Sequence, residues 1–297
     1  MTSIAANIAR PIVTLMGKQL STGATAKDIR AAYNRWSKAL LGPRGVKSEM
    51  TEIAGQRCLK TTPKGARQDA ILLFFHGGGY VFGSLEGHRT MMEHFAKSCG
   101  LVTYMPDYRQ SPENPYPAAV DDGLAAYEEL LKIYDASQIA IGGDSAGGGL
   151  CLALMHRLRD SGRPLPNSAF LLSPWTDLTL AGESYTTNAD TELVVAHPLP
   201  EVTAQFYAGD TPRNDPGVSP LFGSQKGLPP LLVQISTNEI LLNDALGIVE
   251  AARAEGVEVD YQPYEGMWHD WHLMAPLVPE SNKAIAAIGA FVKKHLP

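Results

Sequence analysis

Ala140-Ile141-Gly142-Gly143-Asp144-Ser145-Ala146-Gly147-Gly148-Gly149-Leu150 joins an apolar, strand-like run to a helix-like segment. Residues 143 to 147 fit the pattern G-x-S-x-G, in which a serine occupies a tight turn between a strand and a helix. Small neighbours are needed there because a nearby Cβ would collide with the returning chain. The run from Gln138 to Ile141 and the apolar residues from Leu150 to Met155 supply the strand and the helix. The pattern therefore predicts a nucleophilic Ser145 with its hydroxyl at a helix N-terminus.

Apolar runs and helix-like segments alternate along much of the chain. Ala70 to Phe75 is a continuous apolar run between Asp69 and a glycine cluster, which is typical of a strand buried on both faces of a parallel sheet. The alternation predicts an α/β fold with a mostly parallel sheet covered by helices on both faces. Other predicted strands are Leu101 to Pro106, Ile139 to Gly142, Ala169 to Pro174, Leu231 to Ile235 and Val257 to Tyr261, and predicted helices are Gly87 to Ser98 and Pro117 to Leu131.

The first part of the chain departs from this alternation. Two amphipathic helices are expected before residue 40, broken near Ser21 to Gly23, and Met50 to Thr62 reads as one edge strand. The apolar residues that give the first helix its spacing are Ile4, Ile8, Ile12, Leu15, Met16 and Leu20.

Residues 178 to 227 also interrupt the alternation of strands and helices. They are rich in proline and glycine and hold only a helical fragment around Thr203 to Tyr207. Ligands of open parallel sheets bind beyond the carboxyl ends of the strands, so an insertion leaving from such an end would cover the site. We expect a catalytic core of residues 46–177 and 216–297, with a small helical cap formed by residues 1–45 and 178–215.

Composition excludes some classes of function. The 297 residues are 44% hydrophobic and 19% charged, with a net charge of −6 and no basic run that would bind nucleic acid. The three cysteines are widely spaced, which predicts neither a disulfide framework nor a zinc site and favours a reducing compartment. Arg10, Pro11 and Lys18 interrupt the apolar residues of the N-terminus, so neither a signal peptide nor a membrane span is expected. A cytoplasmic location follows as an expectation.

A nucleophilic serine needs a base, and His269 is the preferred candidate. Of the eight histidines only His269, His272 and His295 follow the fifth of the strongly apolar strands. His269 stands in the loop after the last predicted strand, where a loop can aim the imidazole across the strand ends. His272 is the competitor, at the opening of a following helix. The remaining histidines, His88, His94, His156, His197 and His295, are interpreted as surface residues.

The base in turn needs an acid that orients it. Glu239 follows the strand Leu231 to Ile235 closely, whereas Asp244 lies in a segment that reads as helix. Glu239 is therefore preferred, and Asp244 and Asp260 stay open as alternatives.

An oxyanion must also be stabilised in acyl transfer. His76-Gly77-Gly78-Gly79 directly follows a predicted buried strand, and glycines allow backbone N–H groups to turn toward a substrate. The N–H of Ala146, first in the helix after the nucleophile, can supply a further donor.

The chain resembles the hormone-sensitive lipase family of α/β hydrolases, a group of bacterial carboxylesterases with HGGG and GDSAG motifs. The resemblance implies an α/β-hydrolase fold, a cap built from the N-terminal helices and an insertion after the sixth strand, and oxyanion donors at Gly78, Gly79 and Ala146. Most members have Asp-Pro-Leu at the acid position, where this chain has Glu239-Ile240-Leu241, although some members use glutamate. The matching segments are His76 to Gly79, Asp107 to Arg109, Pro112 to Ala119, Gly143 to Gly147, Ser173 to Trp175 and Gly266 to His269.

Two further groups of residues have expected roles. Arg109 and Asp144 are interpreted as members of buried ion pairs or turn hydrogen bonds beneath the nucleophile, since an unpaired buried charge is costly. The aromatic residues expected to line an acyl or alcohol pocket are Tyr80, Trp175, Phe206 and Trp268.

Together these features predict a serine carboxylesterase that acts on short, uncharged acyl esters without a metal or cofactor. The same residues could attack a thioester, a lactone or an amide, and a non-catalytic ligand-binding protein on this scaffold is the alternative from another class. Related enzymes often pair through the edge of the last strand, here near Val257 to Tyr261. Both a homodimer through that edge and a monomer that covers it stay open.

Overall fold

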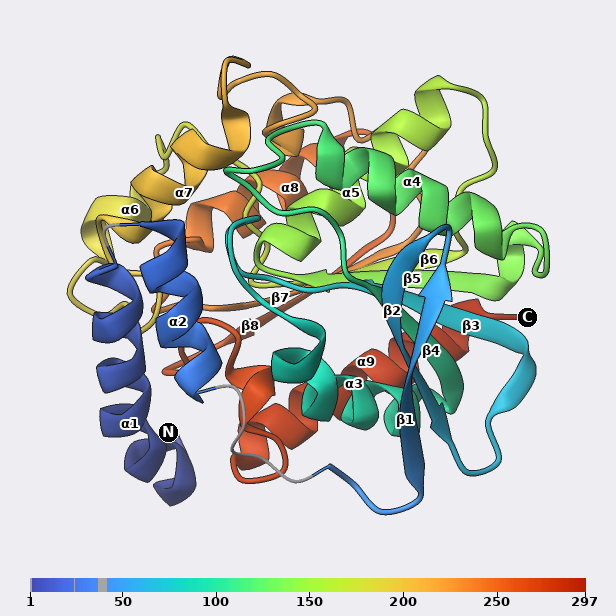
Figure 1. Cartoon of the computed structure of the whole chain (residues 1–297), viewed down its shortest axis with the longest axis horizontal. Helices are drawn as coiled ribbons and strands as arrows, with labels where there is room; N and C mark the ends of the chain where they lie inside the picture. Colours follow the sequence, from blue (N-terminus) through green and yellow to red (C-terminus); the bar gives the residue numbers. More distant parts are fainter. Residues whose placement is uncertain (1, 24, 37–41) are drawn as a thin grey trace.

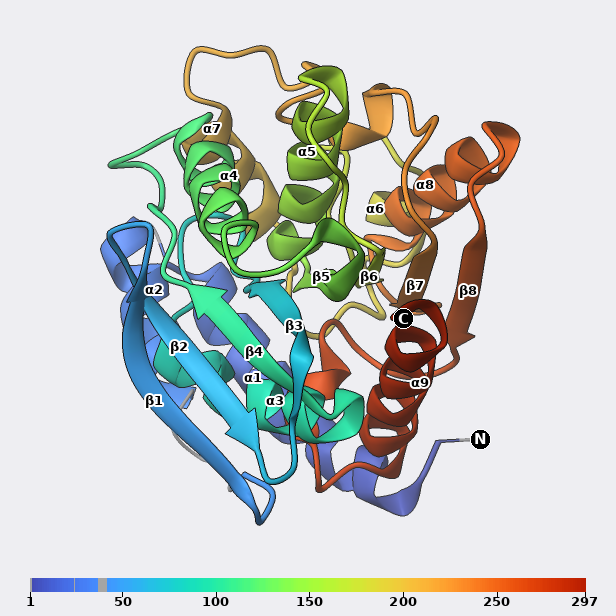
Figure 2. The same ribbon diagram turned by 90° about the vertical axis from the view of Figure 1, so that its right-hand side faces the viewer.

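The computed structural model describes residues 2–23, 25–36 and 42–297. The strands are β1 (Val46–Ile53), β2 (Gln56–Pro63), β3 (Arg67–Phe75), β4 (Leu101–Pro106), β5 (Ile139–Asp144), β6 (Ser168–Leu172), β7 (Leu231–Ser236) and β8 (Val259–Tyr264). Within these ranges they form one sheet of eight strands in the order β1-β2-β4-β3-β5-β6-β7-β8, which reads from left to right in Figure 2. β2 pairs antiparallel with β1 and β4, and every other neighbouring pair is parallel.

Helices cover both faces of this sheet. The α-helices are α1 (Ile4–Ser21), α2 (Ala26–Trp36), α3 (Leu85–Cys99), α4 (Ala118–Leu130), α5 (Ala146–Asp160), α6 (Ser184–Thr187), α7 (Leu199–Ala208), α8 (Leu242–Ala254) and α9 (Pro279–His295), and the 3₁₀ helices are η1 (Ala136–Gln138), η2 (Pro220–Phe222) and η3 (Trp271–Met274). α4, α5 and α8 lie on one face and α3 and α9 on the other, while α1, α2, α6 and α7 gather at one end of the sheet (Figures 1 and 2). The predicted α/β arrangement is confirmed.

β3 shows why its residues form a central strand. Side chains alternate between the two faces of a strand, and here both faces are buried. Ile71, Leu73 and Phe75 belong to the core cluster on one face, whereas Leu72 and Phe74 belong to the cluster on the other. Each fully buried side chain of this size contributes about 1.5–3 kcal/mol relative to exposure.

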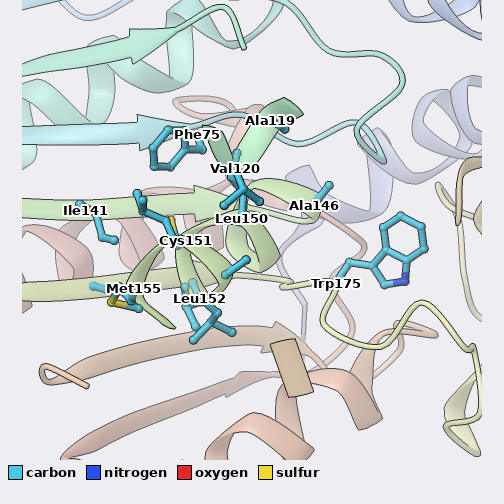
Figure 3. Packing of buried hydrophobic residues seen from close by; sticks show 14 of the residues in the cluster. Phe75, Ala119, Val120, Ile141, Ala146, Leu150, Cys151, Leu152, Met155 and Trp175 are labelled. Carbon is cyan, nitrogen blue, oxygen red and sulfur yellow. The ribbon is translucent and has the colours of Figure 1, made fainter. Parts of the chain in front are cut away.

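The helix that follows Ser145 is anchored in the same core. In Figure 3, Leu150 and Cys151 of α5 lie next to Phe75 of β3 and Val120 of α4. α5 is consequently buried along most of its length, so its N-terminus has a fixed position at the edge of the sheet.

The expectation of one edge strand from Met50 to Thr62 was wrong, because β1 and β2 form a hairpin there. Ile53 pairs with Gln56 across a two-residue turn, and the turn residues Ala54 and Gly55 have φ of 49° and 76°. Positive φ at both central residues is the geometry whose twist matches that of antiparallel strands. Ala54-Gly55 is a weak turn signal in the sequence because alanine rarely adopts a positive φ.

The predicted last strand, Val257 to Tyr261, is also displaced, since β8 begins at Val259 and continues through Pro263 to Tyr264. Proline lacks an N–H and normally marks an edge strand or a strand end. In the described sheet β8 pairs only with β7, so the strand tolerates Pro263.

α1 is amphipathic as expected, but some of its large apolar residues face solvent instead of the protein. Ile4 is 80% exposed and Ile8 68% exposed, whereas Ala6, Ala9 and Val13 are buried. Small residues occupy the contact because the helix packs closely: a Cβ on Gly17 would lie 1.9 Å from the carbonyl oxygen of Leu193. Among the described helices none is long and apolar enough to cross a bilayer.

Polar contacts hold these N-terminal helices over the core as a cap. The Ser21 hydroxyl of α1 donates to the carbonyl of Ala196, which lies between α6 and α7. On α2, Arg30 donates to the carbonyls of Val81 and Ser111 and pairs with Glu113. The N-terminal helices and the segment after β6 therefore cover the same end of the sheet.

Candidate active site

Ser145 stands alone between the last residue of β5 and the first residue of α5. Its φ of 54° and ψ of −121° lie outside the regions that most residues adopt, and such strain persists where the surroundings hold it. Its N–H donates to Leu172 O at 2.8 Å and its carbonyl accepts from Trp175 N at 3.0 Å. A Cβ on Gly143 would lie 2.2 Å from Gly147 O, and one on Gly147 would lie 2.0 Å from Phe75 O. The turn therefore requires both glycines of the motif.

His269 and Glu239 form a buried pair. Nδ1 of His269 lies 2.7 Å from Oε2 of Glu239, and both side chains are almost fully buried. The other carboxylate oxygen of Glu239 accepts from the Ser173 hydroxyl and from the Ser236 N–H, each at 2.8 Å. The glutamate is thus fixed by three donors, one of which is Nδ1 of His269.

The loops that carry this pair are fastened to each other. The Asn238 side chain accepts a hydrogen bond from the N–H of Gly266, which has φ of 69°. The Asn188 side chain, just after α6, donates to the carbonyls of Thr237 and Glu239. The loop after β7 and the loop after β8 are consequently held together at the carboxyl ends of their strands.

The competing candidates lie elsewhere. His272 is buried in η3 with Nε2 2.9 Å from the Gln234 side chain, and burial lowers the pKa of its ring to about 3. Asp244, in α8, accepts from the N–H groups of Thr176 and Asp177. Asp260 is an exposed residue of β8. Of the residues weighed as base and acid, the structure brings only His269 and Glu239 into contact.

Asp270 is a second acidic neighbour of the same imidazole. Its Oδ2 lies 3.1 Å from Nε2 of His269, on the opposite side of the ring from Glu239. Burial by itself would lower the pKa of His269, but the two carboxylates raise it well above its usual range. Burial raises the pKa of Asp270 to about 7, and the nearby imidazole opposes this rise.

Among the described residues, the backbone N–H groups of Gly78, Gly79 and Ala146 near Ser145 donate to no backbone carbonyl. Gly78 and Gly79 have φ of 113° and 59°, so the chain turns back at this point. A Cβ on Gly78 would lie 2.3 Å from Phe82 O. Two of the predicted oxyanion donors, Gly78 and Gly79, therefore sit on a loop whose conformation favours glycine.

An apolar cavity of about 400 Å³ lies between the cap and these residues. Ser145, His269 and Gly79 form part of its wall, together with Met16 of α1 and Leu199 of α7. Trp175 and Trp268 line the cavity as the sequence suggested.

Tyr80 and Phe206, also expected to line a pocket, are not part of this wall. Tyr80 is fully buried and stacks on Tyr207, with ring centroids 3.6 Å apart. Phe206, the residue before Tyr207 in α7, packs against the apolar cluster that includes Leu199 and Trp268. Aromatic residues near strand ends serve here as core, which sequence alone does not distinguish from a pocket lining.

His88 and His156 were expected at the surface, and this was wrong. His88 is 2% exposed, with Nε2 3.3 Å from Asp144 and Nδ1 2.9 Å from the Tyr33 hydroxyl. His156 is buried against Gln225. The buried partner of Asp144 is therefore a histidine.

Arg109 only partly matches its expected role. It pairs with Asp122 at 2.7 Å, but the arginine side chain is 52% exposed.

Sequence reasoning missed three polar residues around the pair. Ser173 and Glu192 hold the acid and its loop, and Asp270 contacts the base. Ser173 directly follows β6 at the carboxyl end of the sheet, which was an available signal. Glu192 lies in an irregular segment with no motif, so nothing in the sequence marks it.

The sheet order and the serine at the strand–helix turn define the class as an α/β hydrolase. A sequence model of a family with the alpha/beta hydrolase fold matches residues 72–273. An acetyl-hydrolase of Streptomyces hygroscopicus is 38% identical over 89% of this chain and 88% of its own length. An esterase of Acinetobacter venetianus is 36% identical over 74% of each chain.

A crystal structure of an esterase from the bacterial hormone-sensitive lipase family has a TM-score of 0.96 to this chain at 38% identity, and the match covers 100% of both chains. A crystal structure of EstE5 has a TM-score of 0.94 at 33% identity, covering 99% of each chain. The chain belongs to the hormone-sensitive lipase family of α/β hydrolases, so the resemblance inferred from its motifs is confirmed.

Proposed function

We propose that the protein is a serine carboxylesterase that hydrolyses short-chain acyl esters through an acyl-enzyme intermediate on Ser145. The observation that carries the proposal is the 2.7 Å contact between His269 and Glu239, because His269 shares the wall of an apolar cavity with the strained Ser145. The esterase and acetyl-hydrolase relatives support a carboxylic ester as the substrate.

In the acylation step Nε2 of His269 accepts the proton of the Ser145 hydroxyl while the oxygen attacks the ester carbonyl. Glu239 keeps the proton on Nδ1 and stabilises the imidazolium that forms. The N–H groups of Gly78, Gly79 and Ala146 stabilise the oxyanion, each donor contributing on the order of 3 kcal/mol in comparable sites. His269 then gives its proton to the departing alkoxide.

In the deacylation step His269 accepts a proton from water, and the resulting hydroxide attacks the acyl carbonyl. The tetrahedral intermediate collapses, the carboxylic acid leaves, and Ser145 recovers its proton from His269. Every proton taken from a nucleophile is returned to a leaving group, so no cofactor is required.

A short acyl chain is proposed from the size of the cavity. Its volume of about 400 Å³ is near the lower end for small-molecule sites, about 300–1,000 Å³. Its walls are largely apolar, which favours an uncharged acyl group. A chain-length series of p-nitrophenyl esters tests this: kcat/KM should peak at short acyl chains, and a maximum at long chains would contradict it.

The Ser145→Ala variant tests the mechanism. Loss of the nucleophile should lower kcat on p-nitrophenyl acetate by on the order of 10⁶-fold, as in another serine hydrolase. Ser161→Ala, which removes an exposed hydroxyl at the end of α5, is the control and should keep wild-type activity. Wild-type activity in a folded Ser145→Ala protein would refute the proposal.

We also propose that residues 1–45 and 178–215 form the cap, over a core of residues 46–177 and 216–297. The packing of α1 on Leu193 supports this division. If it is correct, substitutions in the cap that keep the fold should alter KM for bulky esters more than for acetate. Equal effects on both substrates would count against it.

Assembly and location are further proposals. The outer edge of β8 is unpaired within the described sheet, and we propose that two copies pair there. Light scattering that finds only monomers at micromolar concentrations would exclude this. Cys58, Cys99 and Cys151 are free and buried, which favours a cytoplasmic location that cell fractionation can test.

A further inference from the structure

The carboxylate of Asp270 makes no hydrogen bond to the helix that it precedes. The residue directly follows His269 and is the N-cap of η3, yet its side chain makes no capping hydrogen bond. An aspartate at this position normally accepts from the first N–H groups of the helix. Instead Oδ2 lies 3.1 Å from Nε2 of His269, while Oδ1 is buried without a hydrogen-bond partner in the described structure.

The imidazole of His269 therefore lies between two carboxylates. Glu239 contacts Nδ1 and Asp270 contacts Nε2, and all three side chains are at most 9% exposed. Charges in such a place are only weakly screened by salt, so their mutual attraction is larger than at the surface. An unpaired carboxylate would be costly in this buried place, so Asp270 and the protonated ring of His269 stabilise each other.

We propose that Asp270 is a positioning residue of the reaction, which stabilises the protonated ring of His269 from the Nε2 side and so sets the pH range in which His269 can act as a base. This inference rests on the proposed roles of Ser145 and His269. The imidazolium that forms when Ser145 loses its proton gains a nearby negative charge. The same charge keeps the resting ring protonated up to a higher pH.

Other titratable groups face this pair from each surrounding element. Glu239 adds to the rise in the pKa of His269, and Asp144 adds to that of Asp270. All of them are retained when only Asp270 is changed, so a difference between variants reports on Asp270. These groups are Glu239 after β7, Asp144 of β5, Glu192 of the cap, Tyr33 of α2, His88 of α3 and His272 of η3.

Two substitutions remove the charge without demanding a new backbone. Asp270 has φ of 54° and ψ of 40°, a left-handed conformation that asparagine and glycine both tolerate. Asp270→Asn keeps the shape of the side chain, and Asp270→Gly removes it. Asp244→Asn is the matched control, because it makes the same substitution at another buried aspartate, one that does not touch His269.

The first measurement is the pH profile of kcat/KM for p-nitrophenyl acetate. Loss of an opposite charge at this distance lowers a histidine pKa by about 1–3 units. The acidic limb of both Asp270 variants should therefore move to lower pH by about that amount, while Asp244→Asn keeps the wild-type limb. A constant reduction of kcat/KM at every pH, with no shift of the limb, would overturn the inference.

The second measurement is the titration of the His269 ring nitrogens by ¹⁵N NMR, which does not depend on turnover. The ring pKa should fall in both Asp270 variants by the same amount as the acidic limb. An unchanged ring pKa in both would overturn the inference. If the NMR shift occurs but Ser145→Ala retains activity, the proposed function fails while the relation between Asp270 and His269 stands.

Discussion

Glu192, in the segment between α6 and α7, accepts a hydrogen bond from the N–H of Ile240, the residue directly after Glu239. The donor–acceptor distance is 3.2 Å, and the other carboxylate oxygen of Glu192 accepts from the N–H groups of Val194 and Val195. The segment between α6 and α7 is thereby joined to the loop that carries the proposed acid. Substitutions in this segment are expected to affect the site through this contact.

Glu192→Gln should weaken the hydrogen bonds that connect this segment to the loop after β7. Glutamine has one accepting oxygen and one donating amide, so at least one buried N–H loses its acceptor. The free energy of unfolding should fall by about 1–3 kcal/mol, and kcat should fall with it. Urea unfolding followed by circular dichroism gives the first value. Asp190→Asn, at an exposed site in the same segment, should stay within about 0.5 kcal/mol of wild type.

Glu239→Gln and Asp244→Asn separate the two candidate acids. Glutamine at 239 cannot orient and charge-stabilise the ring, so kcat should fall by on the order of 10⁴-fold, as for the equivalent change in another serine hydrolase. Asparagine at 244 keeps the oxygen that accepts from Thr176 and Asp177, and activity should stay within a few-fold of wild type. Steady-state kinetics on one short ester compare the two. The reverse ranking would assign the acid to Asp244.

Gly79→Ala tests the proposed oxyanion donors. The φ of 59° costs an alanine about 1–2 kcal/mol, and its Cβ would lie 3.0 Å from Thr203. Displacement of the N–H should lower kcat by about 10²–10³-fold. Gly162→Ala is the control: its φ is 69° and no atom lies within 4 Å, so it carries the backbone strain alone. Equal activity of the two variants would remove Gly79 from the donor set.

His88→Phe tests the buried pair beneath Ser145. Loss of the partner leaves Asp144 as a buried unpaired charge, which costs about 3–5 kcal/mol. Burial would lower the pKa of His88, but Asp144 raises it above its usual value. The stabilisation from the charged ring is therefore complete below pH about 6.5 and is lost as pH rises through the raised pKa. The free energy of unfolding of both proteins, measured from pH 5.5 to 9, should show that the variant's loss of stability relative to wild type becomes smaller as pH rises.

His156→Phe is the contrasting case. His156 is buried against a neutral glutamine, and burial lowers the pKa of its ring. The folded protein favours the neutral ring, whereas the unfolded chain can protonate it. The free energy of unfolding of wild type therefore falls as pH drops below about 6.5. The loss of unfolding free energy in His156→Phe, relative to wild type, should therefore become smaller toward low pH. If both variants followed the same pH trend, the charge of His88 would not explain its role.

Local patterns in the sequence were sufficient for much of the fold. The strand from Leu101 to Pro106 was predicted with its observed bounds, because an apolar run between turn residues needs no distant partner to be recognised. The turn at Ser145 was predictable for a similar reason, since the collisions that exclude side chains at Gly143 and Gly147 arise from a short segment and its neighbouring strand. The hairpin at Ala54-Gly55 was missed because the signal there is weak.

The contacts of the site depended on tertiary structure. Nothing in the order of residues states that Ser173 and Glu239 share a hydrogen bond, that His88 is buried on Asp144, or that Asp270 turns toward His269. A sequence determines where strands end and so which loops share one edge of the sheet. Only the packed chain decides which polar side chains in those loops meet away from water, because burial and distance set which charges must pair.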